Sequence, residues 1–257
     1  MCSVTFWPKG RNYRLAMNRD ELLTRVAALP PSIHEVNGLR VLHPREPGGG
    51  TWISLNDAGS SLALVNWYAE PARAPDSVAS RGKVVLAART ADHPDQVTAI
   101  LEALPLAQTH PFRLIGIFPA NEAVREWRWN LADLTELTHP WAPRQWLSSG
   151  FNESEAARVR SEVFHSLRGA PDAGSAAWLR RLHASHAPAS GPYSTCMHRA
   201  DAATVSYTEI DSRPGCQVMR YRPGNPCGCS PLVSKRFTQS QHPRCAQLPS
   251  VALSQNP

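Results

Sequence analysis

Alternation between residue types opens the chain. Residues 2–7 change character at every position, which is the period of two typical of a β-strand. One face would carry Cys2, Val4 and Phe6, and the other Ser3, Thr5 and Trp7. Residues 8–12 have turn composition, and residues 13–18 form a second, mostly apolar run. Because the index sums of paired residues in a hairpin are roughly constant, we expect position 2 to lie opposite position 17 or 18. The hairpin would bring Cys2 beside the polar residues 18–21.

Similar patterns predict the remaining elements. Strands are expected over 51–55, 61–67, 112–118, 124–129, 204–210 and 216–221. Helices are expected after Ser80, from Asp92 or His93 to Pro105, from Asn152 to Leu167, and over 175–184. Residues 22–40 contain Pro30-Pro31, and we interpret them as an irregular connection. Hairpins and helices in this order predict an α+β fold, and a layered αββα arrangement would satisfy the pattern.

Domain organisation follows from where the periodicity ends. At 257 residues the chain can bury a substantial core in one domain. We interpret residues 1–221 as that domain. From Arg222 onward Pro, Ser and Gln dominate, so we expect residues 222–257 to form a disordered or poorly packed tail.

Charge and hydropathy exclude several partners. The net charge is +6, but residues 222–257 contribute four basic residues and no acidic ones, which leaves +2 for the rest of the chain. We therefore expect no nucleic-acid partner. No run of eighteen apolar residues exists, so we expect no membrane span. The N-terminus does not resemble a signal peptide, and we expect a cytoplasmic protein.

The six cysteines show no metal-binding spacing. Cys227 and Cys229 form a C-x-C pair with no second pair, unlike the C-x₂-C pairs of zinc sites. Cys196 and His198 offer soft ligands, but we interpret their segment as an ordinary loop. In a reducing compartment we expect free thiols, no metal site and no required cofactor.

Five short motifs occur in a characteristic order. They are Met1-Cys2, Asn18-Arg19-Asp20-Glu21, Gly49-Gly50-Thr51-Trp52, Leu62-Ala63-Leu64-Val65-Asn66 and Phe112-Arg113-Leu114-Ile115. In this order they resemble the NRDE family, whose animal members are called transport and Golgi organisation protein 2. The resemblance covers residues 1–118 and extends more weakly to about residue 210. It implies a relation to N-terminal nucleophile hydrolases, whose fold places two antiparallel sheets between helices.

A terminal cysteine could act as a complete catalytic unit. Once Met1 is removed, the Cys2 thiol would be the nucleophile and the free α-amine the base, because both groups titrate near neutral pH. Arg19 could favour the thiolate or bind a carboxylate of the ligand. Asp20 or Glu21 could anchor the amine, and the amide of Asn66 could donate to an oxyanion. These residues predict a cysteine amidohydrolase acting on linear amides.

The layout also resembles the bile-salt hydrolase and penicillin V acylase group, with two departures. In that group the Arg precedes the Asn, and the Asp lies three residues beyond the Arg, whereas Asn18, Arg19 and Asp20 are adjacent here. A second Asn is also missing at Ser148-Ser149, unless Asn152 replaces it.

The alternative function is a non-catalytic carrier. The family resemblance implies intracellular trafficking of haem and handling of acyl-CoA or lipids, in which Arg19 would bind the carboxylate of a small amphipathic anion and Cys2 or a His would lie near the iron. Simpler roles also stay open. Arg19 could form an ion pair with Asp20 or Glu21, Asn66 could satisfy a turn, Gly49 and Gly50 could form a bend, and Cys2 could be an ordinary thiol.

Overall fold

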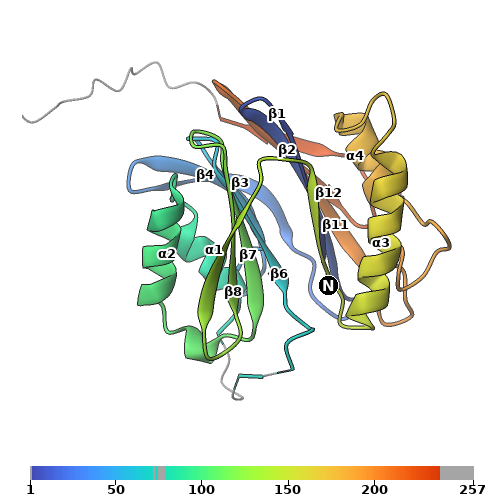
Figure 1. Cartoon of the computed structure of the whole chain (residues 1–257), viewed down its shortest axis with the longest axis horizontal. Coiled ribbons are helices and arrows are strands. Elements are labelled where there is room, and N and C mark those ends of the chain that lie inside the picture. The colour runs from blue at the N-terminus through green and yellow to red at the C-terminus, as the bar shows by residue number, and fades with distance from the viewer. Residues whose placement is uncertain (1, 72, 75–78, 238–257) are drawn as a thin grey trace, which may run out of the picture.

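Two antiparallel β-sheets lie face to face at the centre of the protein, and helices cover both outer faces (Figure 1). The computed structural model describes residues 2–71, 73–74 and 79–237. The strands are β1 Cys2–Lys9, β2 Asn12–Leu22, β3 Leu29–Val36, β4 Leu39–Arg45, β5 Ile53–Asn56, β6 Ser61–Asn66, β7 Phe112–Phe118, β8 Ala123–Trp129, β9 Leu134–His139, β10 Arg144–Ser148, β11 Ala202–Arg213, β12 Cys216–Pro223 and β13 Val233–Arg236. The helices are α1 Gly82–Ala88, α2 Pro94–Ala103, α3 Glu153–Leu167 and α4 Ala176–His183, with a short 3₁₀ turn at Leu106–Gln108.

The strand order separates the chain into two sheets. Sheet A has the order β10-β1-β2-β11-β12-β13, and sheet B has the order β3-β4-β5-β6-β7-β8-β9. Helices α1 and α2 pack on the outer face of sheet B, while α3 and α4 pack on sheet A (Figure 1). The predicted α+β class and αββα layering are confirmed.

In strand β1 the alternating side chains contact two different layers, the core between the sheets on one face and the helices on the other. Val4 and Phe6 point into the core between the sheets, as predicted for that face. On the other face, Ser3 Oγ accepts a hydrogen bond from Arg160 of α3 at 2.9 Å, and Thr5 hydrogen-bonds His183 of α4 at 3.0 Å. Both faces are buried because helices cover the outside of the sheet, so the polar face of β1 meets polar helix residues.

The prediction of an irregular connection over residues 22–40 was wrong. Strands β3 and β4 form a hairpin there, closed by Asn37 and Gly38 with φ of 52° and 74°. Asn-Gly is the residue pair that a tight two-residue hairpin turn favours, because both positions require positive φ. Pro30 and Pro31 are tolerated because β3 is the edge strand of sheet B, where a missing N–H need not leave a neighbouring strand unpaired.

The boundary predicted at residue 222 also needs correction. Strand β13 pairs with β12 and forms the edge of sheet A. Phe237 follows β13, is buried in the core between the sheets, and lies under the guanidinium of Arg40 at 5.3 Å. A four-residue strand is too short to show a clear alternation, so the sequence pattern did not reveal it. The rest of the predicted tail, residues 238–257, lies outside the described residues.

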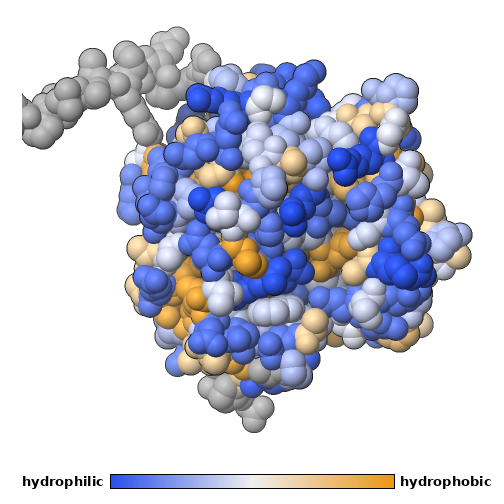
Figure 2. All heavy atoms as spheres, in the orientation of Figure 1, coloured by the Kyte–Doolittle hydropathy of each residue, from blue (hydrophilic) through white to orange (hydrophobic). Residues whose placement is uncertain are grey.

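On the face shown in Figure 2, hydrophilic residues predominate and hydrophobic residues gather in several separate patches. Within the described ranges, no helix is long and apolar enough to cross a membrane.

A buried carboxylate connects the two sheets. Glu126 of β8 is 1% exposed. Its partners are Arg113 at 2.6 Å, Arg128 at 2.8 Å, His139 at 2.7 Å and the indole of Trp146 at 3.1 Å. Arg113 also donates to the backbone oxygen of Leu147 in β10, at 3.2 Å. Since Trp146 and Leu147 belong to sheet A, this network fixes β10, the neighbour of β1, against sheet B.

Replacing Glu126 with Gln should therefore change the acid stability of the protein. Burial acts to raise the pKa of Glu126, but hydrogen bonds and charges from Arg128 and Arg113 outweigh it and lower the pKa to about 2. The stabilisation is thus present above the unfolded-state pKa of about 4.3 and is lost as pH falls towards 2. We expect the variant to lose about 3 kcal/mol at neutral pH and to show a flatter stability profile between pH 2 and about 4.5, measured by urea unfolding.

Glu122 provides the matched control, because its ion pair with Arg11 is exposed. Glu122→Gln should unfold like the parent. Equal acid sensitivity in Glu126→Gln and the parent would show that this carboxylate does not hold the sheets together.

Candidate functional site

A cavity of about 340 Å³ lies where β1 begins and β6 ends. Cys2, Arg19, Asp20 and Asn66 all line it, so the structure brings the four predicted site residues together. Glu21 and Glu46 also contribute to the wall. Residues from both sheets and from the start of α1 therefore enclose one polar space.

Cys2 is the first residue of β1 and pairs with Arg19 on one side and Ser148 on the other. The partner differs by one position from the predicted 17 or 18, because Lys9 pairs with Asn12 and the turn contains only two residues. Cys2 is 7% exposed, and burial raises the pKa of its thiol, while the backbone N–H of Asp20 donates to the sulfur. At neutral pH the sulfur is therefore a thiol, which needs a base before it can attack.

Arg19 already has partners for its charge. Its Nη2 atom lies 2.6 Å from a carboxylate oxygen of Glu46 and 3.2 Å from one of Glu21, and the guanidinium lies 4.6 Å from the ring centroid of Trp52. Of the two ion pairs considered from the sequence, the one with Glu21 forms. Arg19 thus joins β2 of sheet A to the segment before β5 of sheet B, and its charge is largely neutralised.

The Gly49-Gly50 segment forms the bend that brings Glu46 to Arg19. Gly49 has a φ of +87° and donates its N–H to Glu46. Gly50 lies so close to Gly82 of α1 that a Cβ built on Gly82 would be 2.9 Å from the Gly50 Cα. The glycines therefore allow the backbone of α1 to pass close to that of the bend, which is a structural role.

Asn18 and Asp20 point towards the helices behind sheet A. Asn18 donates to the backbone oxygens of His183 and Thr195, at 2.9 and 2.8 Å. Asp20 accepts a hydrogen bond from Thr204 at 2.6 Å and lies 3.4 Å from Arg160. Because neighbouring strand residues alternate in direction, the motif sends only Arg19 and Glu21 towards Glu46, while Asn18 and Asp20 fasten the hairpin from behind.

Asn66 ends β6 and donates to the hydroxyl of Tyr68 at 2.7 Å. A primary amide has two donors, and within the described part of the chain the second N–H of Asn66 has no acceptor, so it is available to another group. Tyr68 also lines the cavity and hydrogen-bonds Arg81.

Arg81 is a cavity residue that sequence reasoning missed. It immediately precedes α1, and its guanidinium donates to the backbone oxygen of Pro111 at 3.3 Å. Burial lowers its pKa, and the nearby Tyr68, Cys2 and Glu21 oppose that effect. In the part of the chain that the structure describes, no carboxylate forms an ion pair with Arg81. Nothing in the local sequence distinguishes this Arg, because its closeness to Cys2 arises only from the stacking of the sheets.

The structure does not give Asn152 the role of a missing second Asn. Its side chain accepts from the N–H of Glu155 at 3.1 Å and caps α3, as the capping pattern predicts. Ser148 is the residue beside Cys2, and its hydroxyl is buried without a hydrogen-bond partner among the described residues. The neighbour of the thiol on this side is therefore a hydroxyl.

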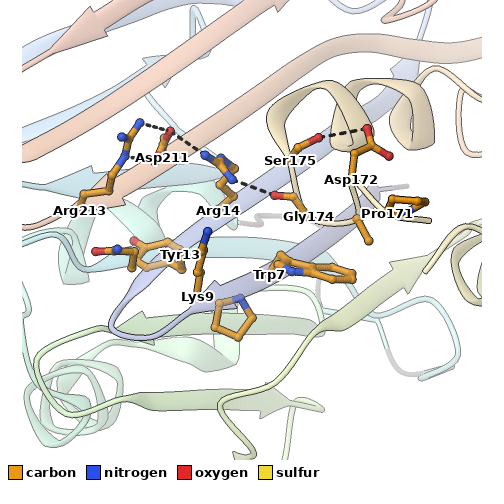
Figure 3. Close-up of a pocket in the computed structure, with 13 residues that line it drawn as sticks. Trp7, Lys9, Tyr13, Arg14, Pro171, Asp172, Gly174, Ser175, Asp211 and Arg213 are labelled. Carbon is orange, nitrogen blue, oxygen red and sulfur yellow. Dashed lines mark hydrogen bonds and ion pairs between the residues drawn. The ribbon is translucent and has the colours of Figure 1, made fainter. Parts of the chain in front are cut away.

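A second cavity, of about 450 Å³, lies near the other end of β1 (Figure 3). Trp7 lines it, about 17 Å along the strand from Cys2 at the usual rise of a strand. Two of its arginines share one carboxylate, since Asp211 pairs with Arg14 at 3.5 Å and with Arg213 at 2.7 Å (Figure 3). None of the predicted site residues reaches this cavity, so we place the candidate site at Cys2.

Several solved structures share the fold of this protein. Penicillin V acylase from Agrobacterium tumefaciens is similar, with a TM-score of 0.51 and 10% identity over 87% of this chain and 83% of that one. A variant of conjugated bile acid hydrolase from Clostridium perfringens gives a TM-score of 0.51 and 9% identity over 96% of this chain and 100% of that one. At such low identity the likeness shows the fold alone, which is that of the N-terminal nucleophile hydrolases.

The family follows from the sequence match. Residues 1–130 match the family described as Transport and Golgi organisation 2, and the chain belongs to this family. No curated protein matches the chain.

The pairing of Arg19 predicts its effect on stability. Arg19→Ala should leave the carboxylate of Glu46 without an ion-pair partner among the described residues, and Glu21 with only Arg25. Because both carboxylates are mostly buried, we expect a loss of about 2–3 kcal/mol in the free energy of unfolding. Arg25 is the matched control, because its side chain is 59% exposed and it pairs with the same Glu21. Arg25→Ala should cost about 0.5 kcal/mol or less. Similar small losses in both variants would contradict the bridging role of Arg19.

Proposed function

We propose that the cavity is the active site of a cysteine amidohydrolase that acts on a linear amide carrying an anionic group. The observation that carries the proposal is the position of Cys2, the second residue of the chain, in a cavity lined by both sheets. Removal of Met1 would give the thiol a free α-amine on the same residue. The fold, in which similar solved structures are an acylase and a hydrolase of conjugated bile acid, supports the proposal.

The chemistry needs only groups at this cavity. The α-amine takes the thiol proton as the sulfur attacks the amide carbon, and the carbonyl oxygen becomes an oxyanion. The unused N–H of Asn66 donates to that oxyanion, a contribution of about 3 kcal/mol where such a donor is well placed. The C–N bond then breaks, the ammonium returns its proton to the departing amine, and a thioester remains. Water, deprotonated by the amine, hydrolyses the thioester and releases the acid and the thiol.

Arg81 is the residue that we assign to the anionic group of the substrate. Arg19 forms ion pairs with two carboxylates. Among the described residues Arg81 forms no ion pair, although the charge of Glu21 acts on it, and it lies near Cys2. A guanidinium can bind a carboxylate or phosphate through two parallel hydrogen bonds. The binding role that the sequence assigned to Arg19 is therefore better supported for Arg81.

The size of the cavity limits the substrate. Its volume of about 340 Å³ is at the small end of the range of about 300–1,000 Å³ for ligand pockets. A small linear amide fits such a space, while haem or acyl-CoA would have to extend beyond it. No cofactor takes part in the steps above, and free thiols at the described cysteines support a cytoplasmic setting.

The carrier of haem or acyl-CoA remains a second candidate, because two observations favour it. Burial raises the pKa of the Cys2 thiol, and the charge of Arg19 is neutralised by Glu21 and Glu46. Both would weaken a catalytic thiol. In this alternative Arg81 would bind the anionic end of the ligand, and Cys2 or His110, which also lines the cavity, would approach the iron.

Kinetics on a panel of linear N-acyl amides with carboxylate or phosphate groups separate the two functions. For the hydrolase, Cys2→Ser should abolish turnover while ligand affinity is retained, because a hydroxyl is a much weaker nucleophile at neutral pH. Arg81→Gln should raise KM by about tenfold or more, since a charge-assisted hydrogen bond contributes about 1.5–3 kcal/mol.

Lys83 gives the matched control, because it is an exposed cation in α1, two residues after Arg81. Lys83→Gln should behave like the parent. Absence of turnover in the parent, combined with haem or acyl-CoA binding that Arg81→Gln weakens, would reject the hydrolase in favour of the carrier. Turnover that survives Cys2→Ser would reject Cys2 as the nucleophile.

A further inference from the structure

Four soft ligands meet at one point outside the candidate active site. They are His186, Cys196, His198 and Cys227, whose ligand atoms all lie within 4.8 Å of one another. The first three belong to the segment between α4 and β11, and Cys227 belongs to the loop between β12 and β13. Cys196 is fully buried, the two histidines are partly exposed, and Cys227 is exposed.

One ring nitrogen of His198 lies close to the ligand atoms of the other three residues. His198 Nε2 lies 3.1 Å from His186 Nε2, 3.5 Å from Cys196 Sγ and 3.5 Å from Cys227 Sγ. A ring nitrogen either donates one proton or accepts with one lone pair, so it has one strong hydrogen bond to make in the plane of the ring. Hydrogen bonding alone therefore does not account for three neighbours around this atom.

The distances agree with those expected around a tetrahedral metal ion. Zinc binds histidine nitrogen at about 2.0–2.1 Å and thiolate sulfur at about 2.3 Å. In a regular tetrahedron these bond lengths place two nitrogens about 3.3 Å apart, and a nitrogen and a sulfur about 3.5 Å apart. The observed separations of 3.1, 3.5 and 3.5 Å are close to these edge lengths.

We propose that His186, Cys196, His198 and Cys227 bind one Zn²⁺ ion in a structural Cys₂His₂ site. Four protein ligands leave no open position, which is characteristic of a structural and not a catalytic zinc ion. Two thiolates and two neutral imidazoles balance the charge of the ion, so the complex can be partly buried without a net charge.

The site would fasten the loop that supports the back of the candidate active site. Between the ligands Cys196 and His198, the N–H of Met197 donates to the Thr204 hydroxyl at 2.9 Å. That hydroxyl in turn donates to Asp20 at 2.6 Å, and the backbone N–H of Asp20 donates to the Cys2 thiol. The zinc ion would thus help to hold Asp20, the residue whose backbone N–H donates to the sulfur.

The cysteine spacing does not predict this site, and from the sequence we expect no metal site. Cys227 and Cys229 do not have C-x₂-C spacing, and the other ligands precede Cys227 by 29 residues or more. The pairing of β11 with β12 is what brings the two segments together. The signal present in the sequence was Cys196-x-His198 with His186 ten residues earlier.

Metal analysis of the intact chain, purified without chelators, tests the proposal. We expect about one zinc per chain, as the four-ligand site requires. Replacing zinc with Co²⁺ should give the intense visible absorption of tetrahedral thiolate coordination. Zinc should also slow the reaction of the exposed Cys227 with a thiol reagent, measured by peptide mass spectrometry.

Cys227→Ser and His198→Ala should bind zinc at least about tenfold more weakly. Cys216→Ser is the matched control, since Cys216 is an exposed free thiol outside the cluster, and it should bind like the parent. The parent chain gives a result that does not depend on whether the variants fold. A parent without zinc that gives no tetrahedral cobalt spectrum would overturn the proposal, as would a native Cys196–Cys227 disulfide in the purified protein.

Discussion

The ion pairing of Arg19 is the interaction on which the candidate site depends. Its guanidinium belongs to sheet A, whereas Glu46 and Trp52 belong to the bend before β5 in sheet B. A buried charge must be paired, so the two sheets meet at a fixed place at this end. Cys2 is the cross-strand neighbour of Arg19. The position of the thiol relative to the opposite wall is therefore set by this contact and, further along, by the Glu126 network.

The hairpin β1–β2 serves two surfaces because successive side chains of a strand point to opposite faces. Arg19 and Cys2 lie on the side that faces sheet B, while Ser3, Asn18 and Asp20 contact α3, α4 and the loop that follows α4. Residues of the NRDE motif thus fix strand β2 through contacts on both of its faces. Such a motif can fix a nucleophile without each of its residues touching a substrate.

The sequence revealed those elements whose hydrophobic pattern is long and whose ends carry clear signals. The opening hairpin, the hairpin β7–β8 and the cap Asn152 are examples. The sequence pattern did not predict β3, where two prolines suggested a break and only the edge position makes them acceptable. It also did not predict β13, which is four residues long. Cys2, Arg19, Asp20 and Asn66 could be placed at one cavity because a hairpin and a strand end position them. Arg81 and the His186–Cys227 cluster could not, because the contacts that bring them into place join distant segments of the chain.

The central claim is that Cys2 is an N-terminal nucleophile. Intact mass spectrometry of the purified chain, before and after incubation with a reactive linear amide, tests it most directly. The account predicts a chain that has lost Met1 and gains one acyl group, located on Cys2 by peptide mapping. Cys216, which is exposed, should stay unmodified by the same amide although ordinary thiol reagents reach it. A chain that retains Met1, or one that is acylated only at exposed cysteines, would contradict the claim.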